Sequence, residues 1–408
     1  MNNKYLSLAI IFLLPLLIQC QQAPKQAQWR GPERNGIYPA KNLLTQWPEG
    51  GPKLAWKFEG LGDGYSSAAV VEDRVYTTGA PDSIGYIYSF DLDGKLLWKK
   101  QYGPEWTTNF PGPRSTPVFY DGLGYVISGL GVVYCFDAEN GNMVWTRDVF
   151  EMMDKKNIVY GITENLVVDG ETIYCTPGGA EANVIAMNRM NGDILWKSKG
   201  NGEKSAYCSP ILIERGGKKF FITSTAASVI SIDTENGALA WKYDLKPKQV
   251  VHGNMPIYRD GYLFVMDGFE AGSLMLKVAE DGYSVSEVWK SDLLDETCGH
   301  SVLIGDNIYV SAESKEKFCC VDWNTGEIKY SIKRFSPGTV IAADGMLYCY
   351  SYFGDFGLVK PTTNGFEVKG EFKLKKKRNL HISHPVIKDG RMYVRYANQL
   401  LVYSIANV

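Results

Sequence analysis

Short apolar runs separated by turn dipeptides recur along the chain after its first twenty residues. Runs such as "GYVISGL" and "GYLFVMDG" have the length of β-strands. They do not alternate strictly between apolar and polar residues, as expected of strands that are buried on both faces. The chain after its first twenty residues lacks long segments with the 3.6-residue period of an amphipathic helix. This pattern predicts an all-β protein.

One motif, Asp-x-x-Asn/Thr-Gly-x-x-x-Trp in its fullest form, recurs along the chain. The clearest copies are "FDLDGKLLW" (90–98), "FDAENGNMVW" (136–145), "MNRMNGDILW" (187–196), "IDTENGALAW" (232–241) and "VDWNTGEIKY" (321–330), with looser copies at 278–289 and 359–372. The glycines recur every ~45 residues, the period of a propeller blade. Glycine supplies the positive φ of a tight turn, and we expect the tryptophan that follows to cover the sheet of the next blade.

Two further strands precede each motif, so each repeat contains four strands, as a propeller blade does. The innermost strands are predicted near residues 67, 116, 164, 209, 255, 301, 339 and 384. The last repeat, 383–405, has three strands, and "PKLAWKFEG" (52–60) is predicted to supply the fourth. The sequence therefore predicts an eight-bladed β-propeller over residues 29–408, with antiparallel blades and no open sheet edge because its terminal strands pair.

The N-terminus differs from the rest of the chain. Its apolar run, Leu6 to Ile18, is too short to span a bilayer and is typical of a signal peptide. Leu17-Ile18-Gln19-Cys20 resembles a bacterial lipobox, although Gln19 replaces the usual small residue. We therefore predict a signal peptide over 1–19, lipidation of Cys20 and a polar tether over 20–28, which would anchor the protein in the cell envelope. The alternative is ordinary secretion with an unpaired Cys20.

Composition narrows the possible partners and the cysteine chemistry. The formal net charge of −2 does not favour a nucleic-acid partner, which normally selects a basic surface. Seven cysteines remain after Cys20, and most lie inside apolar runs such as "VYCF" and "LYCY". We expect these thiols to be small buried side chains rather than members of a disulfide framework.

The segments that lead into the innermost strands face the central funnel of a propeller. All four histidines fall in these segments, together with other polar and aromatic residues: His252, His300, His381, His384, Arg114, Tyr65, Tyr160, Tyr207, Glu164 and Asn254. The sequence therefore predicts a small-molecule or ion site in the funnel. The alternative is that these side chains satisfy loop backbone groups. No metal site is predicted, because "HISH" (381–384) has no carboxylate cluster near it in the sequence.

The repeats, together with "WRGPERNG" (29–36) and "TPGGAEANVIAMNRMNGDILW" (176–196), resemble the pyrroloquinoline-quinone (PQQ) binding-like propeller family. That family includes quinoprotein alcohol dehydrogenases and BamB-like outer-membrane assembly lipoproteins. The resemblance implies a periplasm-facing lipoprotein of the outer membrane, which acts as a scaffold or binding module for a partner protein or a small ligand at the funnel. This is the reading that we favour.

The resemblance also implies an alternative, a PQQ-dependent oxidoreductase acting on alcohols or sugars. Those enzymes hold PQQ and calcium in the funnel with Glu, Asn and a catalytic Asp, and many carry a vicinal disulfide. Glu164 and Asn254 could match two of these ligands, but no funnel Asp is identified. The adjacent Cys319 and Cys320 lie in a strand that leads away from the funnel.

Overall fold

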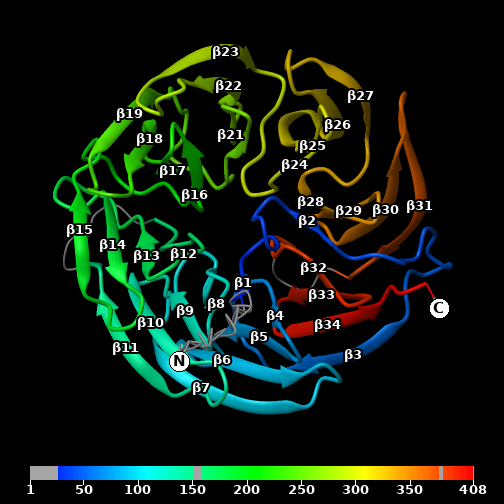
Figure 1. Cartoon of the computed structure of the whole chain (residues 1–408). Coiled ribbons are helices and arrows are strands. Elements are labelled where there is room, and N and C mark those ends of the chain that lie inside the picture. Colours follow the sequence, from blue (N-terminus) through cyan, green and yellow to red (C-terminus); the bar gives the residue numbers. More distant parts are fainter. Residues whose placement is uncertain (1–25, 151–158, 376–379, 408) are drawn as a thin grey trace, which may run out of the picture.

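The computed structural model describes residues 26–150, 159–375 and 380–407. Within these ranges the chain forms eight sheets arranged around a central axis (Figure 1). Each sheet is built on a four-stranded antiparallel meander, as predicted, and we number these blades 1 to 8 in chain order. The described residues contain no helix that is long and apolar enough to cross a membrane. The predicted signal peptide and Cys20 lie outside the described residues.

The strands of each blade are given from the axis outward. Blade 1 contains β4 (Ala69–Val71), β5 (Arg74–Gly79), β6 (Ile84–Asp91) and β7 (Leu96–Pro104). Blade 2 contains β8 (Val118–Tyr120), β9 (Leu123–Ile127), β10 (Val132–Asp137) and β11 (Met143–Asp148). Blade 3 contains β12 (Val167–Asp169), β13 (Thr172–Cys175), β14 (Val184–Asn188) and β15 (Ile194–Ser198). Blade 4 contains β16 (Ile211–Arg215), β17 (Lys218–Ser224), β18 (Ser228–Asp233) and β19 (Leu239–Asp244).

Blade 5 contains β20 (Ile257–Arg259), β21 (Tyr262–Asp267), β22 (Gly272–Val278) and β23 (Val285–Ser291). Blade 6 contains β24 (Val302–Ile304), β25 (Asn307–Ala312), β26 (Lys317–Asp322) and β27 (Ile328–Ile332). A 3-10 helix, η3 (Glu313–Lys315), joins β25 to β26. Blade 7 contains β28 (Gly338–Ala343), β29 (Met346–Ser351), β30 (Asp355–Pro361) and β31 (Phe366–Lys373). Blade 8 contains β32 (Val386–Lys388), β33 (Arg391–Tyr396), β34 (Gln399–Ser404) and β3 (Leu54–Glu59).

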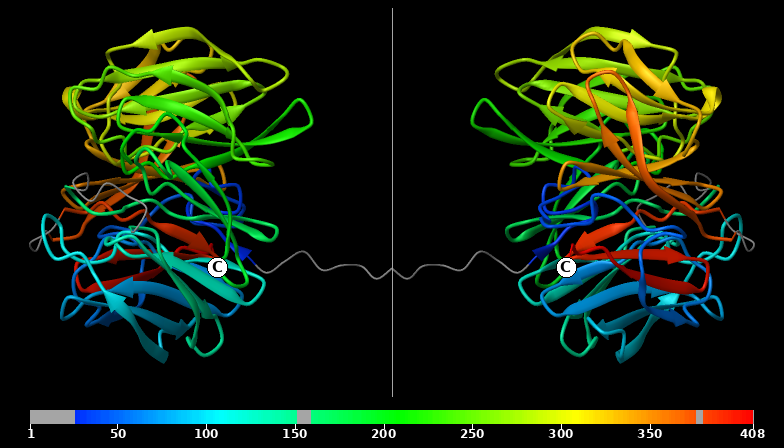
Figure 2. Two further views of the ribbon diagram at one scale, coloured as in Figure 1. Left: turned by 90° about the vertical axis from the view of Figure 1, so that its left-hand side faces the viewer. Right: turned by 90° about the vertical axis from the view of Figure 1, so that its right-hand side faces the viewer.

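The ring closes through blade 8, where the two ends of the propeller share one sheet. β3 pairs antiparallel with β34, with Phe58 opposite Leu400 and Glu59 opposite Gln399. The red C-terminal strands accordingly lie beside the blue N-terminal strand in both side views (Figure 2). The predicted closure is confirmed, and it leaves the edge of β34 covered by a neighbouring strand.

The recurring tryptophan joins a blade to the turn of the next at five positions in the described chain, Trp56, Trp98, Trp145, Trp196 and Trp289. Trp145 of β11 donates from Nε1 to the carbonyl oxygen of Arg189 over 2.9 Å. Its ring packs against Gly192 so closely that a Cβ atom on this glycine would lie 2.7 Å from it. Trp98 makes the same contacts with the turn of blade 2 at Gly141. The motif therefore requires glycine at this position for two reasons: the residue has a positive φ, and a Cβ atom would overlap the indole.

The cores lie between neighbouring blades, and strand side chains alternate between them. Cys319 packs in the core between blades 5 and 6, and the adjacent Cys320 packs in the core between blades 6 and 7. All seven cysteines of the described residues are free thiols, and six of them are buried. The expectation that they serve as small buried side chains is confirmed.

The segment before β3 crosses the centre of the ring (Figure 1). It begins with β1 (Gln26–Ala27), which pairs antiparallel with β8, and continues to β2 (Ile37–Tyr38), which pairs parallel with β28. The described residues thus include 26–28, which we expected to form part of the tether, and Gln26 and Ala27 pair with the propeller. Between these two short strands, residues 28–36 pass through the centre of the ring (Figure 1).

Candidate functional site

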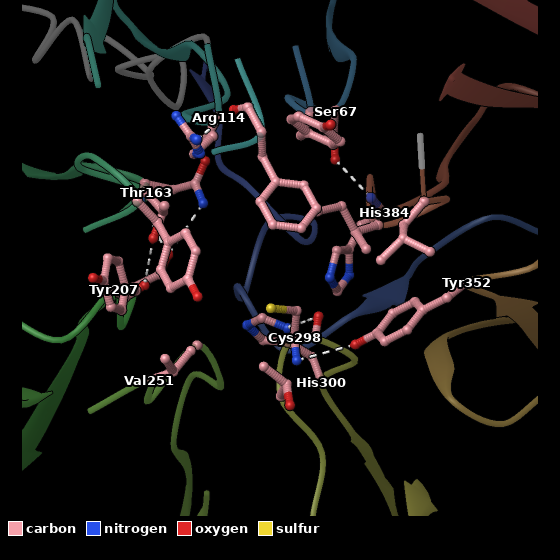
Figure 3. A pocket seen from close by; sticks show the side chains of 18 of the residues that line it. Ser67, Arg114, Thr163, Tyr207, Val251, Cys298, His300, Tyr352 and His384 are labelled. Atoms are coloured by element: carbon pink, nitrogen blue, oxygen red, sulfur yellow. Dashed lines mark hydrogen bonds between the residues drawn. The ribbon is translucent and has the colours of Figure 1, made fainter. Parts of the chain in front are cut away.

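A cavity of about 330 Å³ occupies the funnel, and every blade contributes to its lining. Figure 3 shows representative residues in ring order: Ser67, Arg114, Thr163, Tyr207, Val251, Cys298 with His300, Tyr352 and His384. Most of them precede an innermost strand, so the segments chosen from the sequence do face the funnel. The innermost strands begin within three residues of their predicted positions.

Trp29 of the crossing segment forms the floor of the cavity, and two buried arginines of the same segment, Arg30 and Arg34, hold it in place. The Arg30 guanidinium donates to the carbonyl oxygen of Ser301 over 2.6 Å and to Nδ1 of His384 over 2.9 Å. These bonds tie the crossing segment to blades 6 and 8. Gly36 lies against this side chain, because a Cβ there would be 2.3 Å from Nη2 of Arg30.

Arg34 fixes the other side of the crossing segment. Its guanidinium donates to the carbonyl oxygens of Leu166 and Pro210, over 3.1 and 3.0 Å, and so bridges blades 3 and 4. Burial lowers the pKa of Arg34 to about 10, an effect that the nearby Glu164 partly offsets. The guanidinium therefore remains protonated near neutral pH, and the crossing segment places positive charge beneath the funnel floor.

Aromatic side chains form a continuous wall on one side of the cavity. Neighbouring ring centroids lie 5.8 Å apart for Tyr65 and Phe110, 6.1 Å for Phe110 and Tyr160, and 5.8 Å for Tyr160 and Tyr207. All four rings line the cavity. Aromatic surface of this kind, interrupted by small hydroxyl side chains, is typical of sites for ring-shaped ligands and for apolar peptide side chains.

Arg114 lines the cavity in the segment that leads into blade 2. Its guanidinium donates to the carbonyl oxygens of Asn109, over 2.7 Å, and of Phe110. Burial lowers its pKa to about 10, and Glu105 acts in the opposite direction. Glu105 itself accepts hydrogen bonds from the hydroxyl of Tyr102 and the amide of Gly129, behind the cavity wall. Arg114 thus adds a second positive charge at the cavity and shapes the loop that carries Phe110.

Two of the four histidines do not line the cavity, contrary to the prediction. His252 lies 2.6 Å from Oδ1 of Asp267 through Nδ1, and this partner raises its pKa although burial alone would lower it. His381 contacts the hydroxyl of Tyr350 over 2.5 Å and stacks on Tyr396 with centroids 3.6 Å apart. Both imidazoles serve the packing between loops, which is the alternative that the sequence left open.

Glu164 and Asn254 also lie outside the cavity lining. Glu164 accepts a hydrogen bond from the amide of Thr176 over 2.8 Å, and burial raises its pKa to about 7. The Asn254 amide donates to the carbonyl oxygen of Glu296, and its Oδ1 accepts from the amide of His300 over 3.0 Å. These two side chains stabilise the loops behind the site.

A buried acid cluster beside Tyr352 was missed in the sequence. Glu296 accepts hydrogen bonds from the hydroxyl of Tyr352 and the amide of Thr297, the latter over 3.0 Å. Burial and then the charge of Glu313 raise the pKa of Glu296 to about 8. Tyr352 and Glu313 follow the second strands of their blades rather than precede the first, so the segments chosen from the sequence excluded them.

The residues present do not fit the calcium and PQQ ligand set that the resemblance implied. The described residues contain no group of three or more His, Cys, Asp or Glu side chains placed to hold a metal ion. The carboxylate of Glu164 and the amide of Asn254 are bonded within the fold, outside the cavity lining. The thiols of Cys319 and Cys320 lie on opposite faces of β26, so they offer no disulfide at the funnel.

Solved structures share this fold at low sequence identity. BamB from Moraxella catarrhalis matches with a TM-score of 0.62 and 12% identity, covering 87% of this chain and all of that one. Quinohemoprotein alcohol dehydrogenase from Comamonas testosteroni matches with a TM-score of 0.66 and 11% identity, covering 92% of this chain and 79% of that one. At these identities the likeness shows the fold alone.

Sequence comparison points to the same group of propellers. Quinoprotein alcohol dehydrogenase PedH of Pseudomonas putida is 26% identical over 191 residues, 42% of this chain and 30% of the relative. A quinoprotein ethanol dehydrogenase of Pseudomonas putida is 24% identical over 155 residues, 34% of this chain and 25% of the relative. The chain thus matches less than a third of the length of these relatives. A family model described as "Outer membrane protein assembly factor BamB" matches residues 83–331, more than half of the chain, and the protein therefore belongs to that family of PQQ-like propellers.

Proposed function

We propose that the protein is a binding module of the bacterial cell envelope, which takes a small ligand or a segment of a partner protein into the funnel. The observation that supports this role best is the cavity itself, which is lined by Trp29 and by aromatic rings from the segments that lead into four adjacent blades. A concave, largely aromatic site with a few fixed polar groups is the usual form of a ligand pocket. The family match to BamB is consistent with an envelope protein.

Lipidation of Cys20 would also set the orientation of the funnel. Gln26 pairs with Tyr120, at the end of β8, whereas the residues that line the cavity precede the start of β8. The described chain therefore begins at the face opposite the cavity mouth. Only residues 21–25 would separate an acylated Cys20 from that face. The funnel would then open away from the membrane, toward the periplasm if the anchor is in the inner leaflet of the outer membrane.

Fractionation and co-purification test this proposal. Cys20→Ala should move the protein from the membrane fraction to the soluble fraction of the envelope. Phe110→Ala shortens the aromatic wall at a side chain that is 41% exposed, so the fold should tolerate it. Leu195→Ala, on the outer strand β15, removes a similar exposed apolar group far from the funnel. We expect Phe110→Ala to lose bound ligand or partner and Leu195→Ala to retain it; equal retention would contradict a funnel site.

A PQQ-dependent oxidoreductase remains a second candidate because the curated relatives are quinoprotein alcohol dehydrogenases. The positions of Glu164 and Asn254 do not favour it. Addition of PQQ and calcium to the purified protein, followed by absorbance and by dye reduction with alcohols or sugars, distinguishes the two functions. Turnover would support the enzyme, whereas an unchanged cofactor spectrum without turnover would remove it.

A further inference from the structure

Two imidazoles lie side by side on the floor of the cavity. The ring centroids of His300 and His384 are 4.7 Å apart, and both rings meet Trp29 edge-on, at 4.9 and 5.1 Å. They come from blades 6 and 8 and are both about 4% exposed. Their hydrogen-bond partners determine which ring nitrogen of each carries the proton.

The partners of His384 place its proton on Nε2, which lies 3.5 Å from the hydroxyl of Thr339. The Arg30 guanidinium can only donate, so Nδ1 of His384, 2.9 Å away, must accept. The hydroxyl of Thr339 also lies 3.0 Å from this nitrogen. Burial, with the electrostatic effects of His300 and Arg30, keeps the pKa of His384 well below its ordinary value, and a hydrogen bond to the backbone of Cys298 opposes this shift. The ring is therefore neutral, with its proton on Nε2.

His300 has the opposite arrangement. Its Nδ1 lies 3.1 Å from the carbonyl oxygen of Cys298, which can only accept, so Nδ1 carries the proton. Burial and the charge of Arg30 keep the pKa of His300 well below its ordinary value. Nε2 is then a bare acceptor, buried and without a partner among the described residues. A buried acceptor left unpaired costs about 1–3 kcal/mol, which a ligand donor would recover.

We propose, building on the proposed function, that this floor binds the hydroxyl group of an uncharged ring-shaped ligand, such as a saccharide or a phenol. The hydroxyl donates to Nε2 of His300, while the ring lies against Trp29. A hydroxyl group supplies the missing donor without bringing a charge to the buried floor.

Other ligand classes match the floor less well. A carboxylate has no proton to give to Nε2 of His300. A metal ion would need a lone pair from both rings, and that of His384 is already bonded to Arg30. The positive charges of Arg30 and Arg34 beneath the floor also oppose ammonium groups.

Nitrogen-15 NMR of histidine-labelled full-length protein tests the tautomers without any ligand. We expect two neutral rings of opposite tautomer from pH 6 to 8, assigned with His300→Asn and His384→Gln variants. Asn is chosen at position 300 because φ there is +48°, a conformation that asparagine tolerates. The proposal would be overturned if both rings carried the proton on the same ring nitrogen, or if either ring were charged at pH 7.

Binding of matched probes tests the ligand class. We expect phenol and methyl glucoside to bind and to shift the Nε2 resonance of His300, with whichever binds more tightly identifying the source of the hydroxyl. Anisole, which lacks the hydroxyl proton, should bind about tenfold more weakly than phenol, and benzoate and benzylamine should bind no better than anisole. His300→Asn should remove the preference for phenol over anisole, whereas Leu195→Ala, on the outer strand β15, should keep it.

Equal binding of phenol and anisole to the wild-type protein would mean that the floor holds water only, and the proposal would fail. The binding function would survive that result if Phe110→Ala still abolishes co-purification of the native ligand or partner. Loss of both effects would remove the two proposals together.

Discussion

Arg30 donates to Nδ1 of His384 over 2.9 Å, although 354 residues separate them in the chain. This bond connects the crossing segment to an imidazole that lines the cavity. The same guanidinium also holds the carbonyl oxygen of Ser301. The N-terminal segment is therefore part of the site, because it supplies the Trp29 floor and fixes the tautomer of His384.

Arg30→Lys should destabilise the fold by about 1–3 kcal/mol, since a single ammonium group cannot reproduce both bonds of the planar guanidinium and a buried cation would keep fewer partners. Urea unfolding measures the loss. Arg334→Lys is the control, because Arg334 forms an exposed ion pair with Glu371 and should change stability by less than about 0.5 kcal/mol. Equal effects of the two substitutions would contradict a structural role for the crossing segment.

Alanine substitution at two glycines with the same φ distinguishes the stability cost of a lost tryptophan contact from the cost of an unfavourable φ. Gly192 and Gly217 both have φ of +73°, but only Gly192 touches an indole, that of Trp145. Gly217→Ala should cost about 1 kcal/mol from the unfavourable φ alone, and Gly192→Ala about 1–3 kcal/mol more because its Cβ would overlap Trp145. Thermal and urea unfolding measure both, and similar losses would show that the indole contact adds no constraint.

The elevated pKa of Glu296 predicts a dependence of stability on pH. The folded protein keeps this carboxyl protonated up to about pH 8, whereas an unfolded glutamate releases its proton near pH 4.3. The stability that this group contributes is therefore complete below pH 4.3 and is lost as pH rises through 8. Between pH 6.5 and 8 the wild-type protein should lose about 1–2 kcal/mol of stability, in a range where unfolded histidines are mostly neutral.

Glu296→Gln should flatten this dependence, because the amide stays neutral at every pH. A smaller slope should remain from Glu164, whose pKa burial raises to about 7. Melting temperatures of the two proteins at pH 6.5, 7.2 and 8 provide the comparison. Parallel profiles would mean that Glu296 is ionised in the folded protein.

Most of the fold could be predicted from the sequence repeat, because its glycine turns and tryptophans, at fixed spacing, make contacts between successive blades. Closure by β3 followed from the missing strand of blade 8. The path of residues 28–36 did not follow from any pattern, since Arg30 and Arg34 bond to carbonyl oxygens that are distant in sequence. His300 and His384 line the cavity, and their role as ligand-binding residues stays a prediction. The entry segments could not separate them from His252, whose partner Asp267 lies at the end of β21.

Photo-crosslinking tests the central claim, a funnel that binds, most directly. Benzoylphenylalanine would replace Tyr207, a half-buried ring of the aromatic wall, or Leu195, an exposed side chain on the outer strand β15. After irradiation of native envelopes, the account predicts a specific adduct from position 207, competed by excess unlabelled protein, and none from position 195. Adducts from position 195 alone would place binding on the outer strand and contradict the account.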